Sequence, residues 1–283
     1  MSRRTHPPLI VRITLHIAVY AGALTMVLPV AWIVSTSLKS HHDAISAVPT
    51  LLPAGPPSEW QWHNYAQAWT IAQFGDFYRN SLLVAGVVTV LSVAYNALAG
   101  FAFAKMRFRG RNIAFGLMLA TMLLPFQVYF IFAYVLCGWL GYVDHLQALI
   151  VPFLASAFGI FYMRQSIITV PDSLLDAGRI DGLSDFELFW HIVVPLVRPA
   201  LGALAIFTFM ASWNNFFWPL IVIDSTDNFT LPLAVNRLTS DYFTPSPPIR
   251  MAAAIILIIP TVGVYLIFER SFVKGLTLTG VKG

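Results

Sequence analysis

Long apolar runs dominate this chain and are interrupted by short charged segments. Six intervals contain no Asp, Glu, Lys or Arg: 13–38, 80–104, 112–143, 145–163, 199–223 and 251–268. A transmembrane helix needs about 20 predominantly apolar residues, within a range of roughly 17–25. Each interval is therefore long enough for one membrane-spanning helix. The pattern predicts an all-α integral membrane protein, with six spans in a single transmembrane domain over 1–283.

The third interval is long enough to raise the question of two helices. Pro125 falls within it, and a proline inside a helix kinks or breaks that helix. Residues 138–141 include two glycines and are typical of a loop, so we expect one kinked helix at about 112–136. The charge-poor stretch 44–75 has three prolines and a glycine within 53–57. These residues predict an external loop with a short interfacial helix.

The segment 171–195 lies between the fourth and fifth intervals and is charged. Its helix-capping and helix-breaking residues predict two short helices. Ser173 followed by Asp176 is a weak N-terminal capping signal. Gly182 is well placed to end the first helix in a left-handed turn, because glycine adopts that conformation without steric cost.

The second short helix has stronger signals. Ser184 and Glu187 have the spacing of a capping box, in which each residue satisfies a backbone N–H of the other. Leu183 and Leu188 flank this cap in the positions of a hydrophobic staple. Pro195 lacks an N–H and clashes with the preceding turn, so it predicts the end of the second helix.

Composition supports a membrane protein and the charges predict its orientation. The chain is 58% hydrophobic and 11% charged, with a mean hydropathy of +0.72, whereas soluble domains carry roughly 25% charged residues. Basic residues are enriched on the cytoplasmic side of membrane proteins. If the N-terminus is cytoplasmic, 13 of the 17 basic residues lie inside: Arg3, Arg4, Arg12, Lys105, Arg107, Arg109, Arg111, Arg164, Arg179, Arg198, Arg270, Lys274 and Lys282. The remaining four lie outside: Lys39, Arg79, Arg237 and Arg250.

This asymmetry predicts a multi-pass protein of the bacterial cytoplasmic (inner) membrane, with both termini and segment 171–195 in the cytoplasm. The net charge of +4 is explained by topology and by contact with anionic membrane lipid, so no nucleic-acid partner is expected. The first apolar run is too long for a signal-peptide core, and no small-x-small cleavage pattern follows it. We expect it to remain as the first span.

Other chemistry has little support in the residues. Cys137 is the only cysteine, so no intrachain disulfide can form. His41-His42-Asp43 lacks further ligands at metal-binding spacing, and His16 is more typical of a packed neutral histidine than of a proton relay. No catalytic constellation and no phosphate-binding G-x-x-x-x-G-K-[ST] pattern occurs. We expect no catalytic residue, metal or cofactor in this chain; if ATP drives it, another chain binds the nucleotide.

Segment 171–195 also carries a family signature. Asp176-Ala177-Gly178, Gly182, Ile192 and Pro195 match the pattern E-A-A, three residues, G, nine residues, I-x-L-P. In this respect the chain resembles the permease subunits of bacterial ABC importers, whose cytoplasmic loop carries that signature. Asp replaces Glu, Gly replaces the second Ala, and Val194 replaces Leu. Gly178 costs helix propensity of about 1 kcal/mol relative to Ala.

The resemblance extends along essentially the whole chain and narrows to the carbohydrate-uptake branch. It is carried by Arg79-Asn80-Ser81, by FAFAKMRFRGRN at 101–112, by SWNNFFWPL at 212–220 and by GLTLTGVKG at 275–283. The chain is similar to the smaller permease subunit of maltose-type transporters. The resemblance implies an assembly with a second, different permease, two ATPase subunits that bind ATP and Mg, and an external solute-binding protein.

The resemblance further implies that residues 171–195 form a coupling loop that docks on the ATPase, with the C-terminal tail approaching it as well. The expected docking residues are Leu174, Leu175, Asp176, Ala177, Gly178, Arg179, Asp181, Gly182, Phe186 and Pro195, with Ile180 and Phe189 adding apolar surface. A helix inserted in an apolar groove is a common recognition mode. The alternative is an amphipathic helix that only lies on the membrane surface.

Polar residues within spans are expensive unless they face protein or water, so they are candidates for a solute pathway. These candidates are Gln127, Trp213, Asn214, Asn215 and Phe217. Amides pair with sugar hydroxyls, and aromatic faces cover the apolar side of a sugar ring. For the asparagines the alternative is hydrogen bonding between helices. Gln127 could instead bond backbone freed near Pro125, and Tyr95 with Asn96 more often pack.

Three function classes remain. The favoured one is a permease subunit of an ATP-driven ABC importer, which forms half of the pathway for a small sugar or sugar-like solute. The second is such a permease for a glycerophosphodiester, a polyol or an amino acid. The third is an ion-coupled secondary transporter, which usually has ionisable residues within its spans; here the spans have none except histidine. A membrane enzyme is disfavoured because no catalytic constellation is present.

Overall fold

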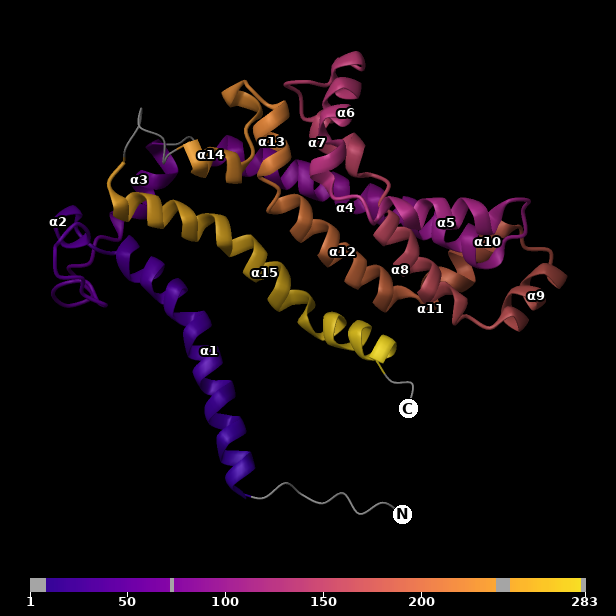
Figure 1. Ribbon diagram of the computed structural model, residues 1–283, viewed down its shortest axis with the longest axis horizontal. Helices are drawn as coiled ribbons and strands as arrows, with labels where there is room; N and C mark the ends of the chain where they lie inside the picture. The colour runs from indigo at the N-terminus through magenta and orange to yellow at the C-terminus, as the bar shows by residue number, and fades with distance from the viewer. Residues whose placement is uncertain (1–8, 72–73, 238–244, 281–283) are drawn as a thin grey trace. The chain divides into compact units, whose positions relative to one another are not determined.

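The computed structural model describes residues 9–71, 74–237 and 245–280, with side chains described up to residue 266 except at 71 and 237. Every element within these ranges is helical, as predicted (Figure 1). Some residues used for the topology prediction lie outside the described part. These are Arg3, Arg4, Lys282, the side chains of Arg237, Arg270 and Lys274, and with them most of the tail at 275–283.

The chain divides into two compact units. Unit 1 comprises residues 1–72 and 237–258, and unit 2 comprises 73–236 and 259–283. Helix α15 (Pro247–Gly280) therefore contributes its first part to unit 1 and the remainder to unit 2.

Unit 1 is built on helix α1 (Leu9–Ser37), followed by α2 (His41–Ala44) and α3 (His63–Ile71). Most of α1 is exposed and apolar, as a lipid-facing helix requires. Its C-terminal end is tied to α3, because the Asn64 side chain donates to the carbonyls of Ser37 and Lys39. The helix α3 thus lies in the stretch where a short helix was predicted.

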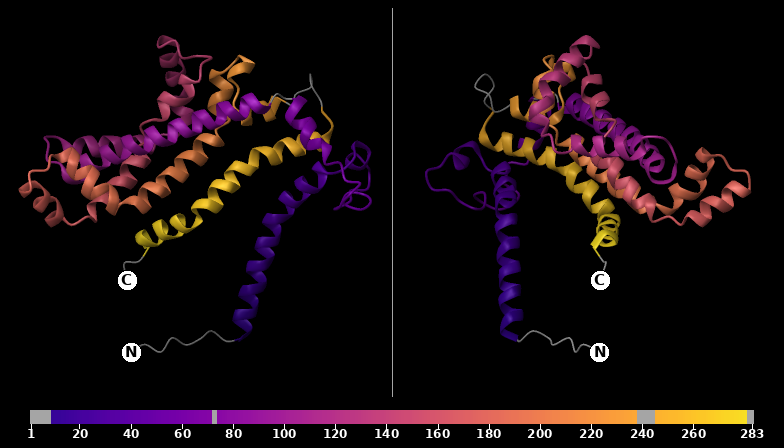
Figure 2. Two further views of the ribbon diagram at one scale, coloured as in Figure 1. Left: turned by 180° about the vertical axis from the view of Figure 1, so that it is seen from behind. Right: turned by 45° about the vertical axis from the view of Figure 1, so that its right-hand side comes forward.

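Unit 2 has three central helices that run side by side in both views: α4 (Phe74–Lys105), α8 (Ala157–Ile168) and α12 (Arg198–Trp213) (Figures 1 and 2). Glycines bring α4 and α8 close together. A Cβ at Gly100 would lie 2.8 Å from the Met163 Cβ, and one at Gly159 would lie 2.5 Å from the Asn96 amide nitrogen. Small residues at such crossings allow close van der Waals packing between membrane helices.

The remaining elements of unit 2 lie at its two ends. At one end are α5 (Arg111–Thr121), α9 (Asp172–Ile180), α10 (Asp185–Leu188), the π turn η2 (Phe189–Val193) and α11 (Val194–Leu196) (Figure 1). Toward the other end are α6 (Phe126–Trp139), α7 (Gln147–Ile150), η1 (Val151–Phe153), α13 (Phe217–Val222), η3 (Thr226–Asn228) and α14 (Leu231–Arg237).

The described helices include three that are long and apolar enough to cross a membrane, Leu9–Ser37, Phe74–Lys105 and Pro247–Leu266. Three further pairs of helices meet the same test together but are bent, by 103°, 41° and 84°. The total is six spans if each bent pair is counted as one. The fold is therefore that of an all-α membrane protein of up to six spans.

The third predicted span differs from a single kinked helix. Helix α5 ends at Thr121 and α6 begins at Phe126, with a bend of 103° between them. Pro125 is the N-cap of α6, with an extended backbone at φ −64° and ψ 144°. It therefore starts a new helix, a position where its missing N–H costs nothing. Helix α6 also continues to Trp139, beyond the predicted end at 136, and the turn follows at Gly141 (φ +69°).

Candidate functional site

The first helix of segment 171–195 is α9, which begins two residues earlier than its capping signal suggested. Pro171 is the N-cap and Asp172 the first helical residue, so Ser173 does not cap the helix. The negative charge of Asp172 in the first turn is stabilised by the positive end of the helix dipole. The C-terminal prediction is confirmed, because Gly182 has φ +86° and the Leu183 N–H donates to the Gly178 carbonyl at 2.9 Å.

The second helix starts with the predicted capping box. Glu187 accepts hydrogen bonds from the Ser184 N–H (2.8 Å) and hydroxyl (2.7 Å), and the Ser184 oxygen accepts from the Glu187 N–H (3.4 Å). These bonds stabilise the ionised carboxylate, above all the one from the Ser184 backbone, and hold the pKa of Glu187 below its usual value. The turn between the two helices is therefore fixed at both of its ends.

One face of segment 171–195 packs against the rest of unit 2. Leu175 and Leu188 are fully buried, and Gly178 lies directly under Leu188 and Ile192. Phe189 is also buried, with its ring centroid 5.5 Å from that of Phe101 on α4. Leu175 and Phe189, which were expected to fill a partner's groove, are instead part of the core of this chain.

The opposite face is exposed and joins apolar and charged side chains. Ile180 is 87% exposed and Phe186 65% exposed; Leu174 is also exposed. Exposed polar and small residues lie among them: Asp176, Ala177, Arg179 and Asp181. Arg179 pairs with Asp176 at 3.0 Å and contacts Asp185 at 3.6 Å, which links the two short helices across the turn. Of the predicted docking residues, Leu175, Gly178 and Phe189 face inward.

The second helix ends at Leu196, one residue after Pro195, close to the predicted end. The helical path runs from Asp185 to Leu196 and then bends by 84° into α12. A π turn at Phe189–Val193 lies immediately before the proline. Wider π turns relax the clash that Pro195 would cause in a regular helix and are frequent at functional positions. Trp190 projects from this turn and is 58% exposed, so it adds an aromatic ring that the sequence analysis did not assign to the surface.

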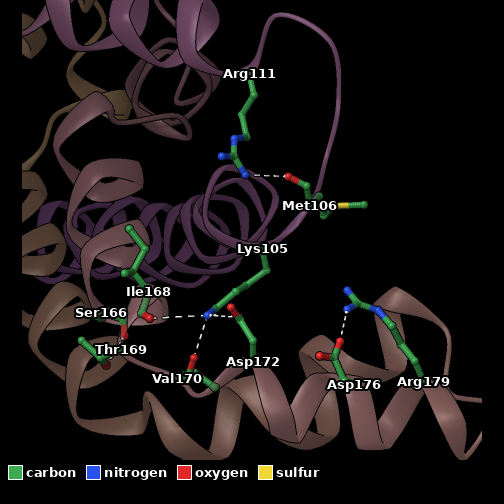
Figure 3. Close-up of polar contacts among 10 residues, drawn as sticks. All are labelled: Lys105, Met106, Arg111, Ser166, Ile168, Thr169, Val170, Asp172, Asp176 and Arg179. Atoms are coloured by element: carbon green, nitrogen blue, oxygen red, sulfur yellow. Dashed lines mark hydrogen bonds and ion pairs between the residues drawn. The ribbon is translucent and has the colours of Figure 1, made fainter.

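The junction between α8 and α9 is held by a lysine from another helix. Lys105, the last residue of α4, donates to Asp172 Oδ1 (2.6 Å), to the Val170 carbonyl (2.7 Å) and to the Ile168 carbonyl (3.5 Å) (Figure 3). The Lys105 side chain is only 7% exposed. Its hydrogen bond and charge hold the pKa of Asp172 below its usual value.

A cavity of about 380 Å³ lies among α4, α8 and α12. Its polar lining consists of hydroxyls and one amide: Ser92, Ser156, Thr208, Ser212 and Asn215. Phenyl rings of Phe153, Phe158 and Phe207 line the remainder with aliphatic side chains. Residues 208, 212 and 215 are spaced so that they share one face of α12 and its C-terminal turn. No lining residue carries a charge.

The other pathway candidates are placed differently. Trp213 is fully buried, its ring 5.5 Å from that of Tyr78, and Asn214 bonds the Met210 carbonyl of its own helix. Phe217 packs edge-on against Phe126 on α6. Gln127 is exposed in the first turn of α6. Of the predicted pathway set, Asn215 alone lines this cavity.

The polar residues of the second span mostly pack. Asn96 is fully buried; its amide donates to the Ser92 hydroxyl at 2.8 Å and accepts from the Ser156 N–H at 3.0 Å. Tyr95 is 51% exposed. Within the described residues no group of three or more His, Cys, Asp or Glu side chains could hold a metal ion.

The amino-acid sequence of this chain matches that of a known protein family. Residues 96–277 match the family described as the inner membrane component of binding-protein-dependent transport systems. The chain belongs to this family. It is thus a multi-pass inner-membrane transport subunit and is not itself an enzyme. The resemblance to sugar-importer permeases noted in the sequence is confirmed.

Similar proteins include several sugar permeases. The arabinooligosaccharide permease AraQ of Halalkalibacterium halodurans is 33% identical over 100% of both chains. The lactose permease LacG of Rhizobium radiobacter is 36% identical over 70% of this chain and 72% of its own. The sn-glycerol-3-phosphate permease UgpE of Yersinia enterocolitica is 31% identical over 92% of this chain and 94% of its own.

A solved structure shares the fold. It is a chain of a bacterial ABC transporter involved in the import of the acidic polysaccharide alginate, with a TM-score of 0.84 and 22% identity. The match covers 96% of this chain and 99% of that chain. A second structure, of the alginate transporter with its pentasaccharide-bound periplasmic protein, matches with a TM-score of 0.65 and 12% identity.

Proposed function

We propose that this chain is the permease subunit of an ATP-driven importer and forms half of the pathway for an uncharged sugar or oligosaccharide. The single observation that carries the proposal is the two-faced segment 171–195. One face is packed into the core of unit 2, and the other exposes Ile180, Phe186 and Arg179. A separate ATPase bound to the exposed face could therefore act on the membrane helices directly.

The partners follow from this geometry and from the family. A chain without a nucleotide-binding motif needs a separate ATPase that binds ATP and Mg. A binding-protein-dependent system also includes an external solute-binding protein. The complete assembly would contain a second, different permease and two ATPase subunits. In it, segment 171–195 and both termini face the cytoplasm, as the distribution of basic residues supports.

The lining of the neutral cavity favours an uncharged, polyhydroxylated solute. Hydroxyls, one amide and three phenyl rings suit a polyhydroxylated ring, because amides and hydroxyls pair with hydroxyl groups and rings cover C–H faces. An anion would lack a cationic partner among these lining residues. Glycerol phosphate is the second candidate, since UgpE relatives are about as similar to this chain as the sugar permeases.

The test is uptake by vesicles that contain the complete complex. With ATP and Mg inside and the binding protein outside, we expect concentrative uptake of a neutral sugar, either an arabinooligosaccharide or lactose. We expect no uptake of glycerol 3-phosphate. Preference for glycerol 3-phosphate would favour the second candidate. Concentrative uptake by vesicles containing this chain alone would contradict the proposed importer.

The orientation is tested separately with single cysteines. In a Cys137→Ser background, Ser173→Cys should react with a membrane-impermeant thiol reagent only in inverted vesicles. Ser58→Cys, in the external loop, should react only in right-side-out vesicles. The reverse pattern would contradict the proposed topology.

A further inference from the structure

Lys105 is a buried cation whose donors all have acceptors. Its ammonium group has three protons and meets three oxygens, one from the Asp172 carboxylate and two from the carbonyls of Val170 and Ile168. Burying an ammonium group is costly unless it is paired and hydrogen-bonded. A side chain that is 7% exposed is therefore held in place by these contacts.

The three acceptors span the junction at which a membrane helix becomes the first helix of segment 171–195. Ile168 is the last residue of α8, Val170 lies in the connection, and Asp172 opens α9. Carbonyls at a helix C-terminus lack partners within the helix and carry partial negative charge. Without the lysine, these carbonyls would lose their donor, and the Asp172 carboxylate would keep only the weaker influence of Arg179 and Arg107.

The lysine itself comes from a third helix, 67 residues before Asp172 in the chain. Helix α4 also contacts the second half of the segment, through the rings of Phe101 and Phe189. Both short helices are thus attached to α4, the first by charge and the second by an aromatic contact. The same helix lines the neutral cavity with Ser92 and Val88, about 20 Å and about 26 Å from Lys105 at a rise of about 1.5 Å per residue.

We propose that Lys105 is a positioning residue that makes α9 and α4 move together, so that displacement of α9 by the ATPase reaches the cavity. This inference rests on the proposed function and adds a specific transmission residue to it. Arg111, in the turn that follows Lys105, donates instead to the Met106 carbonyl at 3.0 Å (Figure 3). The charge of Arg107 also lowers the pKa of Asp172, but less than Lys105 does, and Lys105 makes the direct contact.

The test is the number of solute molecules imported per ATP hydrolysed by the complete complex in vesicles. Lys105→Met keeps the aliphatic stem and removes the ammonium group; we expect ATP hydrolysis to continue while the ratio falls well below that of the wild type. Lys105→Arg should restore most of the ratio. Asp172→Asn keeps both carbonyl contacts and should lower the ratio by a smaller factor.

Lys39→Met is the matched control, because Lys39 is also buried. It donates to the Thr50 carbonyl and lies over the Trp32 ring, away from segment 171–195 in its contacts. We expect this variant to lower thermal stability without changing the ratio of solute to ATP.

An unchanged ratio in Lys105→Met would overturn the inference. If Lys105→Met does not assemble, Asp172→Asn decides, and an unchanged ratio there would equally overturn it. A ratio lowered as much by Lys39→Met would show a general loss of stability and would also overturn it. Loss of ATP-dependent uptake in the wild-type complex would instead count against the proposed function.

Discussion

Gly178 lies so close to Leu188 that a Cβ at position 178 would be 2.5 Å from the Leu188 Cδ2 atom. The two short helices of segment 171–195 therefore touch at a point where the family signature has alanine. Leu188 is fully buried, and the same Cβ would lie 2.9 Å from Ile192 Cδ1. Gly178 is a packing residue in this chain as well as a departure from the signature.

Gly178→Ala should therefore gain no stability. Alanine adds helix propensity of about 1 kcal/mol, but Leu188 must move, and overpacking of this kind costs about 1–3 kcal/mol. Gly116→Ala in α5 is the control, since a Cβ there meets no atom within 4 Å. Thermal unfolding in detergent should show Gly116→Ala above Gly178→Ala. Equal stabilisation by both substitutions would refute the close contact.

Asp176→Lys should weaken binding of the ATPase. Asp176 is exposed and pairs with Arg179 at 3.0 Å, so a lysine there would remove the pair and add repulsion on the proposed docking face. We expect about tenfold weaker association, which corresponds to about 1.4 kcal/mol. The control Asp76→Lys makes the same charge change on an exposed residue of α4. Co-purification in equal amounts from both variants would count against docking at this face.

Asn215→Leu should reduce solute uptake more than Asn214→Leu does. Asn215 lines the cavity, and its side-chain oxygen accepts one long hydrogen bond of 3.4 Å, from the Trp218 N–H. Asn214 bonds its own helix at Met210. The apparent affinity for the neutral oligosaccharide is measured in vesicles containing each complex. Identical values for both variants would leave Asn215 with a packing role alone.

The capping box should stabilise the folded protein only at pH values at which the Glu187 carboxylate is ionised. The pKa of Glu187 is lowered in the folded protein, so its contribution is fully present above the unfolded value of about 4.5 and is lost as pH falls through the lower folded value. Glu187→Gln removes this contribution. The difference in melting temperature between wild type and Glu187→Gln should be constant from pH 8 to 6 and should shrink below about pH 4. A difference that grows on acidification would contradict this.

The local features of segment 171–195 could be predicted because they depend on neighbouring residues. Gly182 and the Ser184–Glu187 pair sit within one turn of the bonds that they make, and the structure has both. Ser173 predicted the wrong N-cap, because Pro171, two residues earlier, has an extended backbone and the helix starts directly after it. Local capping rules did not rank the two signals.

Features that depend on distant residues were not predictable. Lys105 was counted only as a topological charge, since nothing near it in sequence reveals acceptors that lie more than 60 residues away. The inward direction of Leu175 and Phe189 depends on packing against Phe101 in α4. Pro195 predicted the helix end to within one residue, but not the π turn at Phe189–Val193 that precedes it. Pro125 predicted a kink in the third span, but not a break into two helices bent by 103°.

The central claim is that segment 171–195 passes the movement of the ATPase during ATP hydrolysis on to the membrane helices. Gly182→Pro tests this claim most directly. Gly182 has φ +86°, whereas proline is held near −65°, so the turn between α9 and α10 must rearrange. Gly110→Pro imposes the same conflict at φ +81° in another turn and serves as control. In vesicles with the complete complex, uptake and ATP hydrolysis are measured together. We predict that Gly182→Pro continues to hydrolyse ATP and loses uptake while Gly110→Pro keeps both in proportion; normal uptake by Gly182→Pro would contradict the account.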